Sequence, residues 1–142
     1  MIINFHPKEI ESHAGKKLIE KLLAANADEV VHITDKTAEE WQGIIKSSEP
    51  MIFTGPMYWW GLGHDFDKWA QDVLKYNFAF SFDTGSKVGL LDGRPFSIHL
   101  THGTPTEYAA AMHSNVTDRL KSGIFEYCGG QVEVSFYFDK TL

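Results

Sequence analysis

The sequence has very little cysteine, no long apolar run and no excess of basic residues. Cys128 is the only cysteine, so no disulfide bond can form within the chain, which favours a reducing compartment. No apolar segment reaches the length of about 18 residues that a membrane-spanning helix needs. The first seven residues are too short and too weakly basic for a signal peptide. These absences predict a cytoplasmic protein with no membrane insertion.

The charge balance of the chain is acidic. Its 13 Lys and Arg residues stand against 19 Asp and Glu residues, for a formal net charge of -6. Such a chain lacks the basic surface that holds nucleic acids or anionic membranes, so we expect neither as a partner. Hydrophobic residues make up 43% of the 142 residues and charged residues 23%, which is typical of a folded globular protein. The length suits one domain, at residues 1–142.

Strand-like and helix-like patterns alternate along the chain. Strands are expected at residues 2–5, 30–33, 51–54, 96–101 and 132–138. Helices are expected at residues 10–23, 38–45, 66–74 and 105–120. Thr37 and Glu40 form a capping box before the second helix, and Thr104 is expected to cap the fourth. Residues 76–94 lack helical period and are interpreted as a loop. The alternation predicts an α/β fold, a three-layer sandwich around a mostly parallel sheet.

The last two expected strands differ from the first and third in their pattern. Residues 2–5 and 51–54 are nearly continuous apolar runs, typical of strands covered on both faces. In the last two strands apolar residues alternate with polar ones such as His99 and Glu133, which gives one polar face. The sequence stops four residues after Phe138, so we expect the final helix of the fold to be missing. The polar face is then predicted to meet solvent or a partner subunit.

The most unusual residues follow the first, third and fourth expected strands. Open α/β sheets bind ligands beyond the carboxyl ends of their strands. Tyr58, Trp59 and Trp60 lie there, between Gly-Pro and Gly, without helical period. Three consecutive aromatic residues offer a flat apolar surface with indole and phenol donors, which favours a planar aromatic ligand. The alternative is that one ring closes the end of the sheet and another packs on a partner subunit.

This loop and the helix after it resemble one protein family. Residues 54–61 read TGPMYWWG, and residues 66–73 follow with F-x-K-W-x-x-D-V. Both segments are similar to the NAD(P)H quinone oxidoreductase family with a flavodoxin-like fold, which includes bacterial quinone reductases and the ancillary flavoproteins of glutathione-gated potassium efflux. Weaker matches stand in the same order along nearly the whole chain: HP at 6–7, FAF at 78–80, LDGR at 91–94, T-x-G at 101–103 and YCG at 127–129.

The resemblance implies a flavodoxin-like five-stranded parallel sheet of order 2-1-3-4-5 with a flavin, FMN or FAD, at the strand ends. It further implies NADH or NADPH as the hydride donor, a quinone-like or other planar small-molecule acceptor, and a homodimer. The implied cofactor-binding residues are His6, Ser12, Pro56, Met57, Tyr58, Trp59, Trp60, Gly61, Thr101, His102 and Gly103. Residues 6–13 would receive the phosphate, since backbone N–H groups and the dipole at a helix N-terminus favour an anion.

Tyr58 and His102 are the candidate catalytic residues. His102 stands beside the expected site and could donate to a flavin oxygen or to a quinone; the alternative is a solvated loop histidine. His6 could touch the phosphate or cap the local backbone instead.

The first loop departs from the family pattern. The usual cradle rich in Ser, Thr and Asn is replaced by a segment that holds Glu9 and Glu11 with one compensating cation, Lys8. Negative charges beside a phosphate are unfavourable. The alternative function is therefore a non-catalytic flavodoxin-like accessory or binding protein that has lost tight flavin binding.

The seven histidines show no metal-binding pattern, so no metal is expected. His99 and His102 are three residues apart, which in a strand places their side chains on opposite faces. His64 and Asp65 are adjacent but have no third ligand. Cys128 lacks the pattern of an activated nucleophile and is expected to be a small buried residue. No glycine-rich dinucleotide fingerprint follows the first strand, which disfavours a Rossmann domain.

Overall fold

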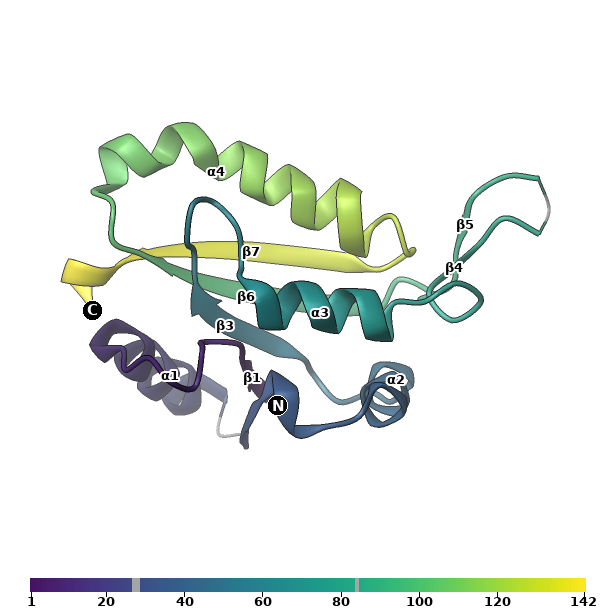
Figure 1. Ribbon diagram of the computed structural model, residues 1–142, viewed down its shortest axis with the longest axis horizontal. Helices are drawn as coiled ribbons and strands as arrows, with labels where there is room; N and C mark the ends of the chain where they lie inside the picture. Colours follow the sequence, from purple (N-terminus) through teal and green to yellow (C-terminus); the bar gives the residue numbers. More distant parts are fainter. Residues whose placement is uncertain (27–28, 84) are drawn as a thin grey trace.

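The computed structural model describes residues 1–26, 29–83 and 85–142, which form a parallel sheet with helices on both faces (Figure 1). The strands of this sheet are β1 (Ile2–Asn4), β2 (Val30–His32), β3 (Ile52–Pro56), β6 (Pro95–His102) and β7 (Gln131–Phe138). Their order is β2-β1-β3-β6-β7, and every neighbouring pair is parallel. Counted over these five strands, the expected order 2-1-3-4-5 is confirmed.

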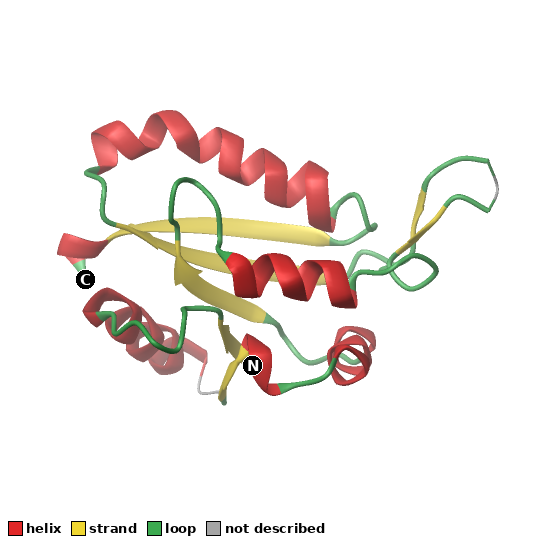
Figure 2. Cartoon of the chain, viewed as in Figure 1, coloured by secondary structure: helices red, strands yellow, loops and turns green. Residues whose placement is uncertain are grey.

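The α-helices of the described residues cover the two faces of the sheet unequally (Figure 2). They are α1 (His13–Asn26), α2 (Ala38–Lys46), α3 (His64–Val73) and α4 (Thr106–Leu120). On one face, Leu18 and Leu22 of α1 pack with Ile2 and Ile52. The larger core lies on the other face, under α2, α3 and α4. Short turns η1 (Ile33–Asp35), η2 (Lys121–Phe125) and η3 (Asp139–Thr141) complete the chain.

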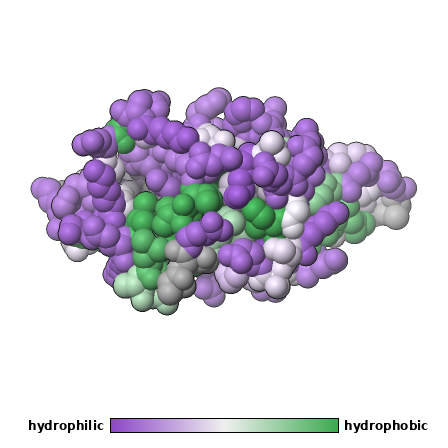
Figure 3. Space-filling model, turned by 90° about the horizontal axis from the view of Figure 1, so that it is seen from below, coloured by the Kyte–Doolittle hydropathy of each residue, from purple (hydrophilic) through white to green (hydrophobic). Residues whose placement is uncertain are grey.

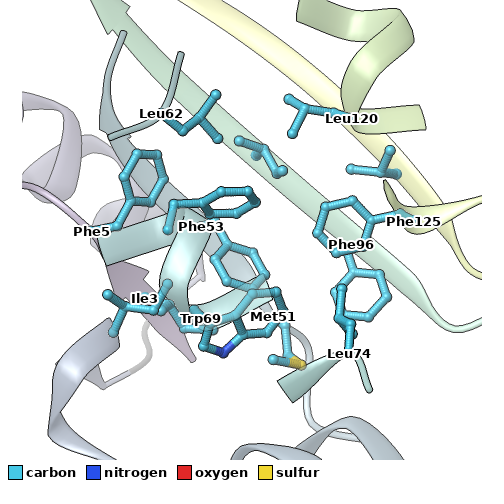
Figure 4. Packing of buried hydrophobic residues seen from close by; sticks show 14 of the residues in the cluster. Ile3, Phe5, Met51, Phe53, Leu62, Trp69, Leu74, Phe96, Leu120 and Phe125 are labelled. Carbon is cyan, nitrogen blue, oxygen red and sulfur yellow. The ribbon is translucent and has the colours of Figure 1, made fainter. Parts of the chain in front are cut away.

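Aromatic rings form the centre of the larger core (Figure 4). The Phe53 ring of β3 lies 5.0 Å from Trp69, 6.2 Å from Phe125 and 6.3 Å from Phe96, measured between centroids. Tilted and edge-on contacts of this kind are favourable beyond the area that they bury. Because Trp69 belongs to α3 and Phe125 follows α4, these contacts fix both helices against β3 and β6.

The local signals for helix ends are confirmed in one case and wrong in two. The capping box before α2 is present, since Glu40 N donates to Thr37 Oγ1 at 3.1 Å and Thr37 N to Glu40 Oε1 at 3.0 Å. The first helix starts at His13 rather than at residue 10, because Ser12 Oγ accepts the Gly15 N–H at 2.9 Å. Thr104 does not cap the last helix; α4 starts after Pro105 instead.

The interpretation of residues 76–94 as a loop is wrong in part. β4 (Phe80–Ser81) and β5 (Val88–Gly89) pair in an antiparallel arm that projects from the sheet in Figure 1. Strands of two residues are too short to show an alternating pattern in the sequence. The backbones of Gly89 and Gly129 pack closely at the base of this arm, since a Cβ on Gly89 would stand 2.3 Å from Gly129 N.

The alternation in the last two strands marks the two faces of the sheet as predicted. Phe96, Ile98 and Leu100 are buried in the larger core, whereas Glu133 on the polar face is exposed. α1 covers part of this polar face, where Lys21 Nζ lies 5.4 Å from the centroid of the Tyr137 ring.

The sheet ends on one side at β2, whose Val30 is 40% exposed. Seen from below, the molecule shows a hydrophobic band across a mainly hydrophilic surface (Figure 3). No helix of the described residues is long and apolar enough to cross a membrane.

Candidate functional site

Two cavities open at the carboxyl ends of the strands, beside the loops that follow β1, β3 and β6. The first, of about 220 Å³, follows β1 and adjoins the start of α1; it is lined by Asn4, His6, Pro7, Lys8, Ile10, Glu11, Ser12, Gly15, Lys16, Ile19 and His32. The second, of about 370 Å³, lies between the loops after β3 and β6; it is lined by Met57, Tyr58, Trp59, Trp60, His102, Gly103 and Thr104. We call them the α1 cavity and the aromatic cavity.

The α1 cavity is built on the N-terminus of a helix. Ser12 caps α1 through its Oγ, which accepts from Gly15 N and keeps its own O–H to donate. A Cβ on Gly15 would lie 3.2 Å from Ser12 Oγ and 3.9 Å from the His6 ring, so the loop packs closely over the first turn. The first N–H groups of a helix and its dipole attract anions. This cavity can therefore receive a phosphate.

A hydrogen-bonded chain fixes the loop that carries His6. Thr34 N donates to His32 Nδ1 at 3.2 Å, so the His32 proton sits on Nε2 and is donated to the His6 carbonyl at 2.7 Å. His6 N donates to Asn4 Oδ1 at 3.0 Å, and His6 Nδ1–H to the Pro7 carbonyl at 2.9 Å. One nitrogen of His6 therefore does bond the local backbone, which was one of the two expected roles.

The charges around the α1 cavity nearly balance. Lys8 Nζ lies 2.9 Å from Asp35 Oδ1. The hydrogen bond from Lys8, followed by that from the His32 N–H, holds the pKa of Asp35 below its usual value. Glu11 and Lys16 add one charge of each sign to the lining. The attraction for a phosphate therefore comes chiefly from the start of α1.

The aromatic cavity is built on a strained turn. Tyr58 N donates to Gly61 O and Gly61 N to Tyr58 O, both at 3.0 Å, so Trp59 and Trp60 are the central residues of a two-residue hairpin turn. Their φ angles are 51° and 66°, in the left-handed region that usually needs Asn or Gly. Trp59 is 96% exposed, whereas Trp60 packs partly on the core. Strain and an exposed indole at one turn indicate a functional site.

A group of ionisable residues lies against the aromatic cavity, with His102 buried and His113 and Asp139 partly buried. His102 is 4% exposed; its Nδ1–H donates to the Thr104 carbonyl at 2.7 Å, and its ring stacks on Phe138. The His113 ring lies 5.6 Å from that of His102. Among the described residues, three buried side-chain atoms lack a hydrogen-bond partner, and two of them are here: His113 Nε2 and Asp139 Oδ1.

The pKa values in this group move in opposite directions. Burial, and then the nearby His102, lower the pKa of His113 below its ordinary value. Burial raises the pKa of Asp139, while His102 acts against that rise. Both shifts disfavour the charged forms of His113 and Asp139 near the aromatic cavity.

Stability should depend on pH through His99 of β6. Burial and the Lys21 ammonium lower the pKa of His99, whose Nδ1 is 2.8 Å from the Tyr137 hydroxyl. The unfolded chain therefore binds more protons below about pH 6.5, and the free energy of unfolding falls as the pH drops through that value. One proton gives a slope of at most about 1.4 kcal/mol per pH unit. Urea titrations between pH 7.5 and 5.5 should show this loss, and His99→Gln should reduce it. An unchanged slope in the variant would assign the proton to another group.

The structure brings most of the predicted site residues into the two cavities. His6 and Ser12 line the α1 cavity, and Met57, Tyr58, Trp59, Trp60, His102 and Gly103 line the aromatic cavity. Pro56, Gly61 and Thr101 do not line either one. Pro56 pairs with Thr101 across β3 and β6, the Thr101 carbonyl accepts the Met57 N–H at 2.8 Å, and Gly61 closes the turn. These three residues hold the strand ends and the turn beside the aromatic cavity without lining it.

Sequence reasoning missed His32, His113 and Asp139. His32 is the last residue of the edge strand β2, and the other two lie on α4 and after β7, so no spacing in the sequence joins them to the loops. Cys128 was expected to be buried, and its side chain is 3% exposed. Desolvation raises the pKa of its thiol to about 11. Within residues 1–26, 29–83 and 85–142, no group of three or more His, Cys, Asp or Glu residues could hold a metal ion.

Comparison with known families settles the class of this fold. A family model described as flavodoxin-like fold matches residues 1–142. The chain belongs to this flavodoxin-like family. The resemblance seen in the sequence is thus confirmed at the level of the family and its fold.

Relatives of this flavodoxin-like protein include named oxidoreductases. An uncharacterized NAD(P)H oxidoreductase of Haemophilus influenzae is 25% identical over 143 residues, which cover 99% of this chain and 65% of the relative's length. The NAD(P)H:quinone oxidoreductase of Methanothermobacter marburgensis superposes with a TM-score of 0.73 at 12% identity, over 97% of this chain and 85% of that one. General stress protein 14 of Treponema denticola, in complex with FMN, gives 0.64 at 18% identity, over 97% and 84%. At these identities the two structures show the fold.

Proposed function

We propose that the chain is a flavin-dependent NAD(P)H oxidoreductase that reduces quinone-like or other planar acceptors. The observation that carries this proposal is the pair of cavities at one sheet edge, one at the start of α1 and one beside the turn of two indoles. A flavin nucleotide has matching parts, an anionic phosphate and a flat aromatic ring. The name of the Haemophilus relative and the FMN held by the Treponema protein support the same function.

The residues present fit such a cofactor. Ser12, Lys16 and the first N–H groups of α1 would hold the phosphate. Trp59 and Trp60 would stack on the ring, and His102 and Gly103 would lie along its other side. We place FMN first and FAD second, because the phosphate and ring of FMN already account for both cavities.

When bound, the flavin supplies the hydride chemistry between NAD(P)H and the acceptor. The chain supplies orientation, a dry surface and protons. The bond from His102 Nδ1 to the Thr104 carbonyl fixes the ring and leaves Nε2 to exchange a proton with an acceptor oxygen. His113 and Asp139 lie near His102, and burial disfavours the charged form of each. The Tyr58 phenol, 45% exposed, is the second donor at the mouth of the cavity.

We propose that a second copy of the chain covers the aromatic cavity. Besides Trp59, the aromatic side chain of Tyr108 in the first turn of α4 is exposed, at 68%. Exposed aromatic residues are typical of an interface. Sedimentation equilibrium with and without FMN should therefore report a dimer, and a monomer in both would refute this cover.

Flavin titration is the test of the proposed function. The purified protein is titrated with FMN and with FAD while absorbance and flavin fluorescence are followed, and NADH or NADPH is then added with a quinone. Saturable binding, bleaching by the nicotinamide and reoxidation by the quinone are the expected results. The absence of binding at high flavin concentration would refute the proposal. It would favour the second candidate, a non-catalytic accessory protein, which the Glu11 carboxylate in the α1 cavity supports.

Glu11→Gln should tighten FMN binding at low salt. Glu11 lines the α1 cavity and repels a phosphate, whereas Glu9 is also exposed but outside the lining. Removal of one partly screened charge should strengthen binding by about threefold, the effect of roughly 0.6 kcal/mol. Glu9→Gln is the matched control and should change the dissociation constant less. Equal effects of the two variants, or an effect that persists in high salt, would contradict a phosphate beside Glu11.

A further inference from the structure

His6 lines the α1 cavity, although the residue is only 8% exposed. One side of its ring is fixed, because Nδ1 lies 2.9 Å from the Pro7 carbonyl oxygen. A carbonyl oxygen only accepts hydrogen bonds, so the proton of the neutral ring sits on Nδ1. The other ring nitrogen, Nε2, therefore carries a bare lone pair when the ring is neutral.

The Nε2 atom of His6 is unpaired but still open. Among the described residues it has no hydrogen-bond partner, and it is not one of the three unpaired side-chain atoms that are closed to solvent. The Cδ2 atom bonded to it lies 3.9 Å from the place of a Cβ on Gly15, in the first turn of α1. This edge of the ring thus stands beside the helix N-terminus that attracts an anion into the α1 cavity.

A phosphate and the bare Nε2 are both hydrogen-bond acceptors. A phosphate monoester has its second pKa at about 6, so at pH 7.5 its oxygens carry no proton to donate. Movement of the single ring proton from Nδ1 to Nε2 would break the bond to the Pro7 carbonyl. A second proton on the ring keeps that bond and turns the clash at Nε2 into a charge-assisted hydrogen bond to the phosphate.

The fixed charges around the cavity leave the phosphate without a free cation. Lys8 Nζ is paired with Asp35 Oδ1 at 2.9 Å. Lys16 lines the cavity, and so does Glu11, which offsets it. A positive charge on the His6 ring would therefore add directly to the attraction of the helix N-terminus.

His32 is the other histidine of the cavity lining, and both of its ring nitrogens are occupied. Its Nδ1 accepts from Thr34 N at 3.2 Å, and its Nε2–H donates to the His6 carbonyl at 2.7 Å. A second proton on His32 would displace the Thr34 N–H. Of the two histidines, His6 is the one with a nitrogen free to receive a proton.

We propose that His6 takes up a proton from solvent when the α1 cavity binds the phosphate of FMN, so that FMN binding tightens as the pH falls. The inference rests on the proposed function, because FMN supplies the anion. The charged ring donates Nε2–H to the phosphate and keeps donating Nδ1–H to the Pro7 carbonyl. Retention of the cofactor then follows the pH of the compartment.

Calorimetric titration with FMN at pH 7.5, in buffers of different ionisation enthalpy, counts the protons. Each bound FMN should take up roughly half a proton or more. Riboflavin, which has the same ring system and no phosphate, should take up none. The FMN dissociation constant should fall by roughly three- to tenfold from pH 8 to pH 7, since one linked proton gives at most about tenfold per pH unit.

His6→Gln separates the proton from the hydrogen bond. Its side-chain amide offers a neutral N–H donor and takes up no proton, so the variant should still bind FMN but lose the proton uptake and the pH dependence. His13→Gln is the matched control, because His13 begins α1 and is exposed outside the cavity lining. It should keep the proton uptake of the unaltered chain.

Imidazole ¹⁵N spectra of the unaltered chain give a reading that needs no variant. Without FMN at pH 7.5, the His6 ring should show one protonated nitrogen, Nδ1, and one bare nitrogen, Nε2. With FMN bound, both should be protonated. A free chain whose His6 ring already carries two protons, or carries its single proton on Nε2, would refute the proposal.

FMN binding without proton uptake, or with equal uptake in His6→Gln, would also refute it. If FMN does not bind at all, the proposed function fails and inorganic phosphate becomes the probe. Phosphate that binds and protonates His6 would then support this inference on its own. A chain that binds neither FMN nor phosphate would overturn both.

Discussion

Trp59→Ala should weaken FMN binding about 30-fold and leave folding nearly unchanged. Stacking of an aromatic side chain on a flat heterocycle contributes about 1–3 kcal/mol, and a loss of about 2 kcal/mol corresponds to this factor. Trp59 is 96% exposed in the free chain, so its removal leaves no cavity in the core. A surface change of this kind alters the free energy of unfolding by less than about 0.5 kcal/mol. Flavin fluorescence titration and urea denaturation measure the two effects.

Trp60→Ala is expected to behave differently. Trp60 packs partly on the larger core, so its removal should lower both the FMN affinity and the free energy of unfolding. Val30→Ala at the sheet edge is the control for loss of an apolar side chain outside both cavities, and it should leave the FMN affinity unchanged. If Trp59→Ala kept full FMN affinity, the indole would serve a protein contact and not a cofactor.

Gly89→Ala should be the most destabilising single change considered. The added Cβ would stand 2.3 Å from Gly129 N and 2.5 Å from the Cys128 carbonyl carbon. These are backbone atoms, which cannot turn aside as a side chain does. The Gly129 φ of 81° restricts the facing turn further. We expect a loss of about 3 kcal/mol or more, and a melting temperature lower by about 10 °C.

Gly43→Ala is the control for this change of a glycine to alanine. Gly43 lies within α2, and a Cβ there would meet nothing within 4 Å. Alanine is a better helix former, so this variant should gain about 0.5–1 kcal/mol. Thermal unfolding of the two variants should therefore move in opposite directions. A small loss for Gly89→Ala would mean that the arm can shift away from Gly129 at low cost.

The fold could be predicted from the sequence because its signals are local and repeated. Buried strands such as β3 are short apolar runs, and the stripe of α3 places Phe66, Trp69 and Val73 on the core. The β4–β5 arm was missed because its pairing depends on contacts with residues 128–129, nearly 40 positions away, which no local pattern records. Thr104 was misassigned as the cap of α4 because Pro105 is still extended, with φ −51° and ψ 144°, so the helix begins one residue later.

The candidate site could be predicted only where it lies in loops with unusual composition. Trp59 and Trp60 stood out because consecutive aromatic residues fit neither a helix nor a strand. His113 and Asp139 did not, because one occupies an ordinary helix position and the other follows a strand. Their significance rests on burial and on missing partners, which only the packed chain defines.

The turn at Trp59 and Trp60 affects how much of the protein accumulates in a cell. Without a ligand, the chain carries two left-handed tryptophans and an exposed indole, and a bound ring would cover the indole. A ligand that binds only the folded chain raises its stability with concentration, and less stable proteins are degraded faster. Under the proposed function, the riboflavin supply of the cell would therefore set how much of this protein accumulates. Starvation for the vitamin would then deplete the protein itself as well as its activity.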